Sequence, residues 1–578
     1  MRIFVVIVSL FFALNCCADT VEHVWLRNYQ PGVPHTINPD QYSSLTEFFA
    51  ESFNKYKDHP CFENMGKTIS YSELDVQSRD FAAFLQYKFK LAKGDRFAIM
   101  MPNVLQYPVA MLGILRAGGT VVNINPLYTA DELEHQLVDS QATGIIVLES
   151  FAHTLAKVID KTQVQHVIVT RVGDALNPVK ALAVNFSVKY IKKKVPTWHI
   201  KDRYWFKDVM AQGAKAKYQD PKLSGEDLAF LQYTGGTTGF PKGAMLTHRN
   251  MTSNILQTAQ MLSQLLRYKR EVVFGALPMY HIYAVIATCL QPIYYGSTIV
   301  LITNPRDTKS VIKEIKSHKF TGMIGVNTLF SLLLEQPELT KEDFSEVAIS
   351  MSGGMPLQKS VAERWQQLSN NHITDTYGLT ETSPASCMNP SHFTQYTGSV
   401  GVPIPSTEIS IRDDNNHDIG SDKVGELYIR GPQVMRGYWN KPAETKNVLS
   451  EDGWLRTGDI GRIDANGFVY LVDRKKDMIN VSGFKVYPNE VEAVIGAMPQ
   501  ILEVAVIGVM SPNHGELVKA FVVKKDQSLT EEAVIAYCRE HLTGYKVPKF
   551  VEFRDSLPKS NVNKILRRAL KEETKEQS

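Results

Sequence analysis

The chain has 578 residues, more than one hydrophobic core usually supports, so we expect at least two domains. Its composition, 44% hydrophobic and 21% charged, is that of a globular protein, and a net charge of only +3 gives no basic excess for a nucleic-acid partner. The 6 cysteines include no Cys-x-x-Cys pair, which argues against a disulfide framework or a zinc site and favours a reducing compartment.

The first residues, 1–20, resemble a secretory signal. Arg2 precedes an apolar run from Ile3 to Leu14, and small residues follow. The run is shorter than the about 20 apolar residues that span a bilayer. Three interpretations compete: export, an anchor at a membrane surface, and a start codon assigned too far upstream. No later stretch has the sequence of a membrane span.

Short apolar runs, expected to be buried parallel strands, alternate with helical spacings in the first half of the chain. The strands are predicted over 96–103, 143–150, 166–174 and 228–232, and helices over 107–119 and 248–262. This alternation favours a layered α/β architecture.

A basic stretch, KYIKKKVP over 189–196, follows the apolar segment 181–188. Two interpretations remain. The segment is either a short basic amphipathic helix on a membrane surface or an ordinary solvated surface helix. The sequence alone favours the second.

The strand over 228–232 leads into YTGGTTGFPKGAM, residues 233–245. Its glycines let the backbone approach a ligand closely, its threonines add hydroxyl groups, and Lys242 adds a positive charge, which together suit oxyanions. The order Lys242-Gly243-Ala244 differs from a Walker A loop, which needs Gly-Lys-Ser/Thr. A glycine-rich turn without a ligand is the alternative.

Three short motifs carry further candidate residues. LPMYHIY (277–283) presents His281 either as a buried, hydrogen-bonded histidine or as a polar group beside an acyl carboxylate. TYGLTET (376–382) joins an aromatic ring that can stack on a purine to Glu381, a carboxylate that can hold Mg²⁺ beside substrate phosphates. TGD (457–459) places Asp459 in a predicted turn, where it can accept ribose hydroxyls or form an Asx turn.

From about residue 395 the pattern changes to alternating apolar and polar residues with turn clusters, which predicts a small antiparallel β-rich section. Strands over 503–510 and 517–525 and a helix over 530–542 follow. We expect an N-terminal domain over 21–473 and a small C-terminal α/β domain over 474–578. VDRKKD (472–477) is the predicted linker. The basic region 541–571, which contains Lys564, favours an anionic partner.

Taken together and in order, these motifs resemble the adenylate-forming superfamily of acyl-CoA synthetases, luciferases and peptide-synthetase adenylation domains. The segments LQYTGGTTG, KGAMLTHRN, TYGLTET, GYW, DGWLRTGDIG, DRKKDMINVSGF and VYPNE carry the resemblance, which extends from about Val24 to Glu573 and is greatest to bacterial long-chain fatty-acid–CoA ligases. The resemblance implies a mixed α/β fold with a mobile C-terminal domain. It also implies a reaction in which a fatty carboxylate attacks ATP to give acyl-AMP and pyrophosphate, and coenzyme A then displaces AMP.

The resemblance further implies roles for individual residues. The β- and γ-phosphates are expected at Thr234, Gly235, Gly236, Thr237, Thr238, Gly239 and Lys242, and Mg²⁺ at Glu381 and Thr234. Adenine is expected to stack on Tyr377, beside Gly353, Gly354 and Met355, and the ribose is expected at Asp459 and Arg474. Thr376, Gly378 and Thr380 are also expected to bind the cofactor. Lys564 is expected to contact the α-phosphate and the carboxylate, with His281 beside the latter. Lys476 is the expected hinge, and Gly483 and Lys485 are expected near the thioester-forming side.

Two departures bear on these roles. Asn563 stands before Lys564 where the superfamily usually has glycine, and asparagine tolerates the left-handed backbone that such a turn needs. The stretch around His281 contains no Asp or Glu that would pair with a substrate ammonium, so an uncharged apolar tail is expected, with 325–334 lining its channel.

Alternatives within the enzyme class are a fatty acyl-AMP ligase that donates to a carrier protein, and a synthetase for medium-chain or aryl acids. An alternative outside it is a fatty-acid-binding or uptake protein with decayed catalysis, which the intact Lys242, Glu381, Asp459, Arg474 and Lys564 disfavour.

ATP and coenzyme A are cytosolic, so export would separate the enzyme from its substrates. We therefore expect peripheral contact with the cytoplasmic face of the inner membrane, in support of fatty-acid uptake and β-oxidation. Residues 1–20 are then an anchor or a start-site artefact. A homodimer is compatible with the sequence.

Overall fold

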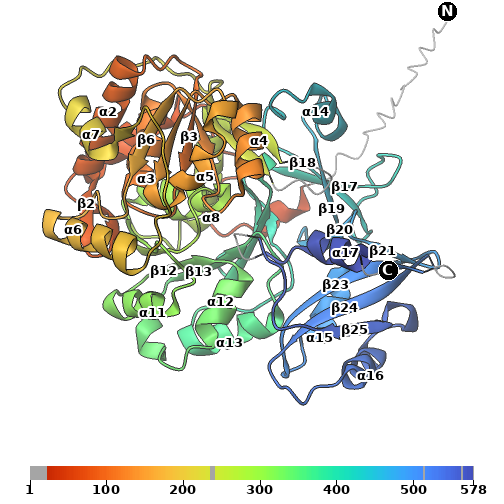
Figure 1. The fold of residues 1–578 in the computed structure, drawn as a ribbon. Helices are drawn as coiled ribbons and strands as arrows, with labels where there is room; N and C mark the ends of the chain where they lie inside the picture. Colours follow the sequence, from red (N-terminus) through yellow and green to blue (C-terminus); the bar gives the residue numbers. More distant parts are fainter. Residues whose placement is uncertain (1–22, 235–240, 512–514, 561–563, 577–578) are drawn as a thin grey trace, which may run out of the picture.

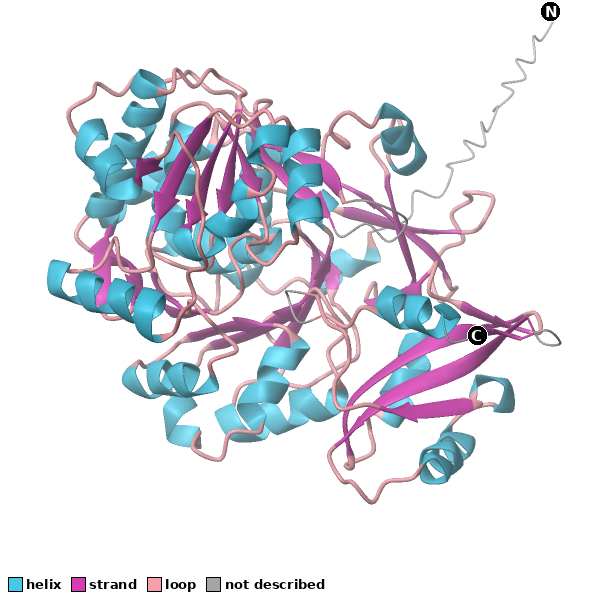
Figure 2. Cartoon of the chain, viewed as in Figure 1, coloured by secondary structure: helices cyan, strands magenta, loops and turns pink. Residues whose placement is uncertain are grey.

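The computed structural model describes residues 23–234, 241–511, 515–560 and 564–576 (Figure 1). The predictions for residues 1–20, for Gly235 to Gly239 and for Asn563 lie outside these ranges. Figure 2 shows large strand-and-helix layers above a smaller unit that contains the C-terminus. The mixed α/β fold expected from the sequence is confirmed.

A seven-stranded sheet forms the first layer, and its central strands are parallel and apolar on both faces. In spatial order it contains β7 (Tyr204–Trp205), β6 (His166–Thr170), β5 (Gly144–Leu148), β3 (Arg96–Met100), β4 (Thr120–Asn123), β8 (Leu228–Thr234) and β9 (Lys242–Thr247). The predicted strands over 96–103, 143–150, 166–174 and 228–232 are confirmed as β3, β5, β6 and β8, with shorter or slightly shifted ends. β4 was not predicted, because its four residues directly follow the glycines that end a helix.

A nine-stranded sheet forms the second layer and is also mostly parallel. In spatial order it contains β16 (Val402–Pro403), β15 (Ala385–Met388), β14 (Ile373–Gly378), β13 (Ile349–Gly353), β12 (Gly322–Gly325), β10 (Val272–Gly275), β11 (Thr298–Leu301), β1 (Pro60–Asn64) and β2 (Lys67–Ser70). The first strands of the chain, β1 and β2, therefore join this later sheet and not the one that follows them in sequence.

The helices of these two layers begin with side-chain caps at several points. Ser70 and Glu73, Thr129 and Glu132, and Thr247 and Asn250 form capping boxes at α2, α4 and α8. The α-helices are α1 (Leu45–Tyr56), α2 (Tyr71–Lys88), α3 (Gln106–Arg116), α4 (Ala130–Ser140), α5 (Ala152–Ala156), α6 (Pro178–Phe186), α7 (Phe206–Gly213), α8 (His248–Leu262), α9 (Ile282–Val285), α10 (Gln291–Tyr295), α11 (Thr308–Ser317), α12 (Asn327–Leu334) and α13 (Lys359–Ser369). The helices predicted over 107–119 and 248–262 are confirmed as α3 and α8.

Short 3-10 and π turns complete these layers. The 3-10 turns are η1 (Val24–Asn28), η2 (Glu149–Phe151), η3 (Ile159–Lys161), η6 (Lys341–Phe344) and η7 (Thr380–Thr382), and the π-helical turns are η4 (Ser187–Ile191) and η5 (Ile286–Leu290).

The β-rich section predicted after residue 395 is confirmed as a four-stranded antiparallel sheet. It consists of β17 (Glu408–Arg412), β18 (Gly425–Arg430), β19 (Leu455–Ile463) and β20 (Val469–Arg474), with α14 (Pro442–Val448) beside it. Asp459 lies inside β19, so the turn predicted at 457–459 is wrong. The turn residues Thr457 and Gly458 sit at a pairing irregularity in the long strand and do not end it.

The C-terminal unit contains its own sheet and helices, drawn in blue in Figure 1. The sheet contains β22 (Phe484–Val486), β21 (Ile479–Val481), β24 (Gly515–Lys524), β23 (Ile501–Ser511) and β25 (Phe550–Phe553), and the helices are α15 (Pro488–Ile495), α16 (Glu531–His541), η8 (Gly544–Lys546) and α17 (Arg567–Glu576). The strands and the helix predicted here are confirmed as β23, β24 and α16.

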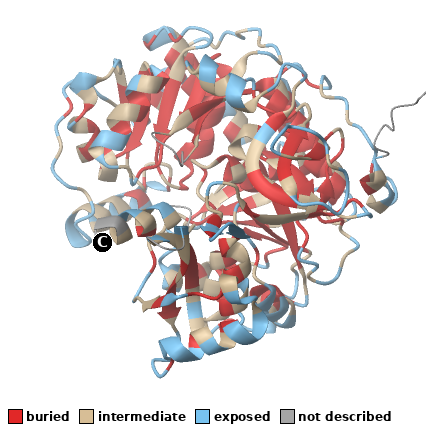
Figure 3. Ribbon diagram, turned by 90° about the vertical axis from the view of Figure 1, so that its right-hand side faces the viewer, coloured by how far each residue is buried: buried red, intermediate tan, exposed pale blue. Residues whose placement is uncertain are grey.

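Burial divides the described chain into separate cores. Buried side chains fill the interiors of the sheets, and exposed residues lie on the outer helix faces (Figure 3). The clusters before residue 470 share no residue with the clusters that begin at Ile479. Half of the predicted linker, 472–474, is strand β20, and the chain turns at 475–477. The exact domain boundary stays a prediction.

Candidate active site

The predicted adenine residues collect at one edge of the nine-stranded sheet. β13 and β14 are parallel neighbours, and Gly353 pairs with Thr376 at their carboxyl ends. A Cβ atom on Gly353 would lie 2.5 Å from Oγ1 of Thr376, so this position needs glycine. Gly354 follows with a φ of +77°, and Met355, Tyr377, Gly378 and Thr380 continue from the same two strands. Carboxyl ends of parallel strands are where α/β sheets bind ligands.

The predicted ribose residues face each other across two strands. Asp459 of β19 pairs with Arg474 of β20, and Arg474 Nε lies 3.3 Å from Asp459 Oδ1. The hydroxyl of Tyr377 donates to the other oxygen, Asp459 Oδ2, at 2.7 Å. Burial, and then the charge of Asp459, raise the pKa of Tyr377 well above its usual value. These contacts join the edge of the nine-stranded sheet to the four-stranded sheet.

Glu381 lies in η7, immediately after β14. Its Oε1 accepts a hydrogen bond from the hydroxyl of Tyr438 at 2.7 Å, and its backbone oxygen accepts one from the amide of Met435 at 2.8 Å. Glu381 and Tyr438 line a cavity of about 460 Å³ that also reaches Thr457, Gly458 and Lys476. A carboxylate with one oxygen fixed by a hydrogen bond is thus presented to a space large enough for phosphate groups.

Thr234 and Lys242 stand opposite each other at the ends of β8 and β9, on either side of the predicted phosphate loop. The Lys242 ammonium forms an ion pair with Glu444 of α14 and lies 5.1 Å from the ring centroid of Tyr438. The amide of Trp439 donates to the carbonyl of Gly243 at 2.8 Å. The loop's anchored ends therefore lie beside the residue that fixes Glu381.

His281 is held by a network that starts in the seven-stranded sheet. Nδ2 of Asn103 donates to the carbonyls of Gly275 and Leu277 at 2.9 and 2.8 Å, and its Oδ1 accepts from the amide of Met279 at 2.9 Å. Tyr107 donates to the carbonyl of Met279. The backbone before His281 is therefore fixed at several points.

The same segment is fixed from the strand that carries the phosphate loop. Gln232 of β8 donates to the carbonyl of Tyr280 at 3.0 Å, and Asn123 of β4 donates to the side-chain oxygen of Gln232 at 2.9 Å. The loop's supporting strand and the His281 segment therefore share one buried polar network, in which unpaired groups would be costly.

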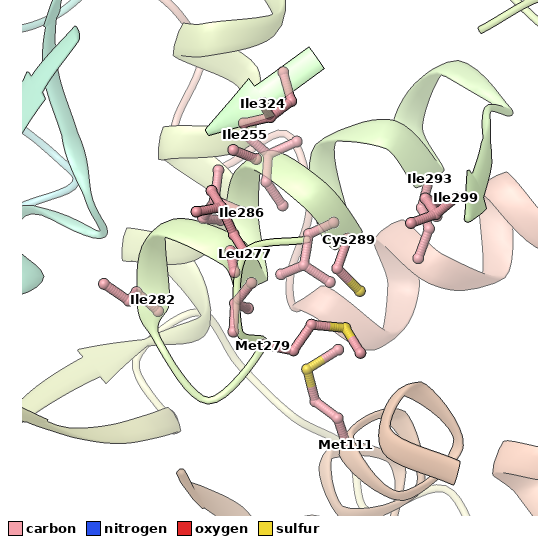
Figure 4. Close-up of a cluster of buried hydrophobic side chains, with 14 of the residues drawn as sticks. Met111, Ile255, Leu277, Met279, Ile282, Ile286, Cys289, Ile293, Ile299 and Ile324 are labelled. Atoms are coloured by element: carbon pink, nitrogen blue, oxygen red, sulfur yellow. The ribbon is translucent and has the colours of Figure 1, made fainter. Parts of the chain in front are cut away.

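Apolar side chains surround the His281 segment on its other side. Met111 of α3 and Met279 point toward each other below η5, with Cys289, Ile286 and Leu277 above them (Figure 4). His281 itself caps α9, accepting from the amide of Tyr283 at 3.2 Å. Burial, and then the charge of Lys564, lower the pKa of His281 to about 4. The imidazole is therefore neutral at pH 7.

Lys564 reaches this site from the C-terminal unit. Its amide donates to Ser560 Oγ at 3.1 Å, and an isolated antiparallel bridge pairs Lys559 with Ile565. Burial, and then the positive charge of Arg474, lower the pKa of Lys564 to about 7, whereas Asp459 opposes this shift. Its influence on the pKa of His281 places it near that residue as well. Lys564 is thus electrostatically coupled to the ribose residues and to His281.

The remaining predicted residues fall in two places. Lys476 lines the cavity beside Glu381, and burial, followed by repulsion from Arg474, lowers its pKa to about 8. Gly483 and Lys485 are exposed in the β21–β22 hairpin, where Gly483 has a φ of +91°. The structure does not bring these two residues to the strand edge that holds Tyr377.

Sequence reasoning missed several supporting residues. Tyr438 lies in the GYW motif, so the sequence could have marked it as a candidate site residue. Glu444 and Asn103 lie in no motif that would have indicated their roles. Arg567 was also missed. It forms ion pairs with Asp473 at 3.2 Å and Glu492 at 2.7 Å, and so ties α17 and α15 to β20. That role depends on three distant segments meeting and has no local pattern.

Glu381 is the carboxylate predicted to hold a metal ion. In the ranges that the structure describes, no group of three or more His, Cys, Asp or Glu side chains could hold a metal ion. Mg²⁺ typically keeps waters and takes one or two carboxylates together with substrate phosphates. Glu381 lines the cavity and its Oε1 is held by Tyr438, which fits such a ligand set.

Two parts of the chain match described families. Residues 49–439 match the family described as AMP-binding enzyme, and residues 490–564 match the AMP-binding enzyme C-terminal domain. The break between the two matches contains the predicted linker.

Curated relatives are similar over nearly the whole chain. The long-chain-fatty-acid–CoA ligase of Yersinia pestis is 54% identical over 553 residues, covering 96% of this chain and 98% of the relative. The protein of the same name from Escherichia coli O157:H7 is 53% identical over 555 residues, covering 96% and 99%. Among solved structures, ATP-bound MatB from Rhodopseudomonas palustris has a TM-score of 0.79 at 29% identity, covering 92% of this chain and 99% of MatB.

Proposed function

The chain belongs to the AMP-binding enzyme family, and we infer that it is an enzyme that uses ATP to join long-chain fatty acids to coenzyme A. The observation that carries this function is the meeting of Lys564, Asp459 and Arg474 beside the carboxyl ends of β13 and β14. The similarity of the chain, over nearly its full length, to relatives named for this activity supports the long-chain substrate. The carrier-protein and medium-chain alternatives are not favoured.

In the first half-reaction, the fatty carboxylate attacks the α-phosphorus of ATP. The new bond joins a carboxylate oxygen to phosphorus, and the bond to pyrophosphate breaks. We propose that Asp459 and Arg474 hold the ribose, that Tyr377 with Gly353, Gly354 and Met355 borders the adenine, and that Lys564 stabilises the charge that develops on the α-phosphate and carboxylate. Support for this comes from the positive charge of Arg474, which adds to burial in lowering the pKa of both Lys476 and Lys564.

Pyrophosphate is proposed to leave through the loop between Thr234 and Lys242. The Lys242–Glu444 ion pair is partly exposed, so exchanging Glu444 for a phosphate costs little. Mg²⁺ is proposed to bind Glu381, with Thr234 nearby, and would neutralise phosphate charge when bound. The neutral His281 is proposed to contact the carboxylate, and residues 325–334 to border the acyl tail. Val326, Leu329, Phe330 and Leu333 are buried in that stretch.

In the second half-reaction, the coenzyme A thiolate attacks the acyl carbonyl, and AMP leaves. We propose that the C-terminal unit, 474–578, turns about Lys476, so that Lys564 departs and Gly483 and Lys485 approach. The exposed, positive-φ Gly483 and the separate C-terminal cores support a unit able to move as a body.

The cellular setting is also a proposal. We propose that the enzyme acts at the cytoplasmic face of the inner membrane as a peripheral protein, where it supports fatty-acid uptake. No described helix combines the length and the apolar character needed to cross a bilayer. A homodimer stays a prediction, as does the interpretation of residues 1–20 as an anchor or a start-site artefact.

Measuring AMP release from fatty acids of about eight to eighteen carbons, with and without coenzyme A, tests the function. We expect turnover to require coenzyme A and to be fastest with the long chains, because the stretch around His281 contains no Asp or Glu and is mostly apolar. Omitting coenzyme A should leave acyl-AMP bound. Accumulation of acyl-AMP in the presence of coenzyme A would contradict a CoA ligase and favour transfer to a carrier protein.

Adenylation is expected to depend on pH through Lys564. Its pKa of about 7 means that the cation predominates below that pH and is lost as the pH rises through it. If the cation is the active form, kcat/KM for acyl-AMP formation falls above this pKa by up to about tenfold per pH unit. Lys564→Arg keeps the charge at all these pH values and should remove the decline, whereas a decline shared by both proteins would belong to ATP or another group.

A further inference from the structure

Helix α6 and the π-helical turn η4 that continues it present an apolar face to the outside of the molecule. Val179, Leu182, Phe186, Tyr190 and Ile191 are each between 55% and 85% exposed. They are five of the sixteen exposed large apolar side chains of the described residues, yet they fall within 13 residues of sequence. Four of them recur at the spacing of one helix face, at i, i+3, i+7 and i+11.

The opposite face of α6 is fixed to the protein, so the apolar face cannot simply turn inward. Ala181 is buried against Gly173, where a Cβ atom would lie 2.8 Å from the Ala181 carbonyl oxygen. Asn185 accepts from the amide of Gly173 at 2.8 Å and donates to Asp174 at 3.2 Å. A surface helix normally buries its large apolar side chains, whereas α6 buries the small Ala181 and leaves Val179, Leu182 and Phe186 exposed.

Lysines surround this face without exposed acidic partners. Residues 175–201 contain six lysines and no Asp or Glu. Lys192, Lys193 and Lys194 are exposed directly after η4. The nearby carboxylates are engaged elsewhere: Glu149 is buried between Arg171 at 2.9 Å and Lys189 at 3.2 Å, and Asp174 lies beneath the helix. The segment therefore combines an outward apolar face with an unopposed positive edge.

We propose that α6, η4 and Lys192–Lys194, here called the α6 face, dock the enzyme on the surface of an anionic phospholipid bilayer. Apolar side chains would enter the acyl boundary while the lysines meet lipid phosphates, as interfacial helices do. Figure 1 shows α6 on the outer left of the molecule, away from the C-terminal unit, so docking leaves that unit free to turn. The inference names the surface for the membrane contact proposed above and does not rest on catalysis.

Charge complementarity favours this occupant over a second copy of the chain. An equal copy would bring the same lysines to the contact and repel them. A bilayer that contains phosphatidylglycerol supplies both a negative surface and an apolar layer, which are the two chemistries that the α6 face offers.

The test is co-sedimentation of the full chain with vesicles of phosphatidylcholine alone or mixed with phosphatidylglycerol. We expect binding to the mixed vesicles that weakens at high salt. Lys192→Glu/Lys193→Glu/Lys194→Glu should weaken it roughly 100-fold, and Leu182→Asp/Phe186→Asp about tenfold or more. Both variants keep residues 1–20, so a loss reports on the α6 face and not on the N-terminus. The two variants alter different side chains, so if one of them fails to fold, vesicle binding by the other still tests the proposal.

Matched controls carry the same changes elsewhere. Lys309→Glu/Lys313→Glu/Lys316→Glu on α11, and Leu502→Asp/Met510→Asp on β23, should bind vesicles like the wild type. All proteins should make acyl-CoA from a soluble eight-carbon acid at equal rates. Wild-type-like binding by both α6 variants would overturn the inference while leaving peripheral membrane contact intact. A concentration-dependent dimer that Leu182→Asp/Phe186→Asp abolishes, without vesicle binding, would overturn it in favour of a second copy.

Discussion

Replacing Lys564 by alanine is expected to lower the rate of acyl-AMP formation by about 10³-fold, while thioester formation from supplied acyl-AMP stays within about threefold of the wild type. The side chain stands beside Asp459 and Arg474 in the arrangement described here, where it can meet the α-phosphate. In the second half-reaction, it is proposed to have left with the C-terminal unit. The two half-reactions should therefore separate in pyrophosphate exchange and in acyl-CoA formation from acyl-AMP.

Stability provides the check that the loss is chemical. Unliganded Lys564 is a buried amine among Arg474, Arg567 and Lys476, all of which disfavour its charge. Its removal should not lower the melting temperature, because a repelled buried cation contributes little to folding. Lys549→Ala, an exposed lysine of the same unit, serves as the control and should leave both half-reactions unchanged. Equal loss of both half-reactions in Lys564→Ala would contradict the proposed rotation.

The low pKa of Lys564 follows from its burial and from the positive charges near it. Burial lowers the pKa of Lys476 and of Lys564, and the positive charge of Arg474 lowers both further, whereas Asp459 opposes both shifts. A triphosphate brings the negative charge that this group lacks, and its binding should raise the pKa of Lys564. The site is thus arranged for a polyanion, which explains why cations are placed so closely.

The fold was predictable where local pattern determines structure. Apolar runs such as 96–100 and 144–148 predict buried parallel strands because both faces of such a sheet are covered by helices. The sequence could not show that β1 pairs with β11 and not with β3, because that choice depends on contacts more than two hundred residues apart.

The site divides in the same way. Tyr377, Glu381 and Asp459 stood out through their motifs, and the structure brings Tyr377 and Asp459 into contact. Asp459 was misassigned to a turn because Thr-Gly-Asp is a turn sequence, whereas the neighbouring strands β18 and β20 hold it in a sheet. Glu444 and Arg567 are ordinary charged residues in sequence, and only tertiary packing gives them partners.

Replacing Glu381 by alanine is expected to reduce ATP–pyrophosphate exchange by about 10²-fold and to raise the Mg²⁺ concentration needed for half-maximal exchange. Glu381 follows Tyr377 in the TYGLTET motif. It lines the cavity beside the ends of the phosphate loop, Thr234 and Lys242. Glu381→Gln should be nearly as impaired, because it keeps the shape and a hydrogen-bond acceptor but loses the charge that a metal ion requires.

Tyr438→Phe separates the charge of Glu381 from its orientation. The hydroxyl of Tyr438 fixes Oε1 of Glu381 at 2.7 Å, so its loss leaves the charge but lets the carboxylate rotate. We expect pyrophosphate exchange to decrease by about tenfold or less and to recover partly at high Mg²⁺. Residues that hydrogen-bond to a metal ligand typically change metal affinity by about 10- to 100-fold, and loss of a single hydrogen bond should lie near the lower end. If Glu381→Gln exchanged pyrophosphate at the wild-type rate at low Mg²⁺, the carboxylate would not be the metal ligand. Recovery in Tyr438→Phe but not in Glu381→Gln would instead show that charge binds the ion and that the tyrosine only aims it.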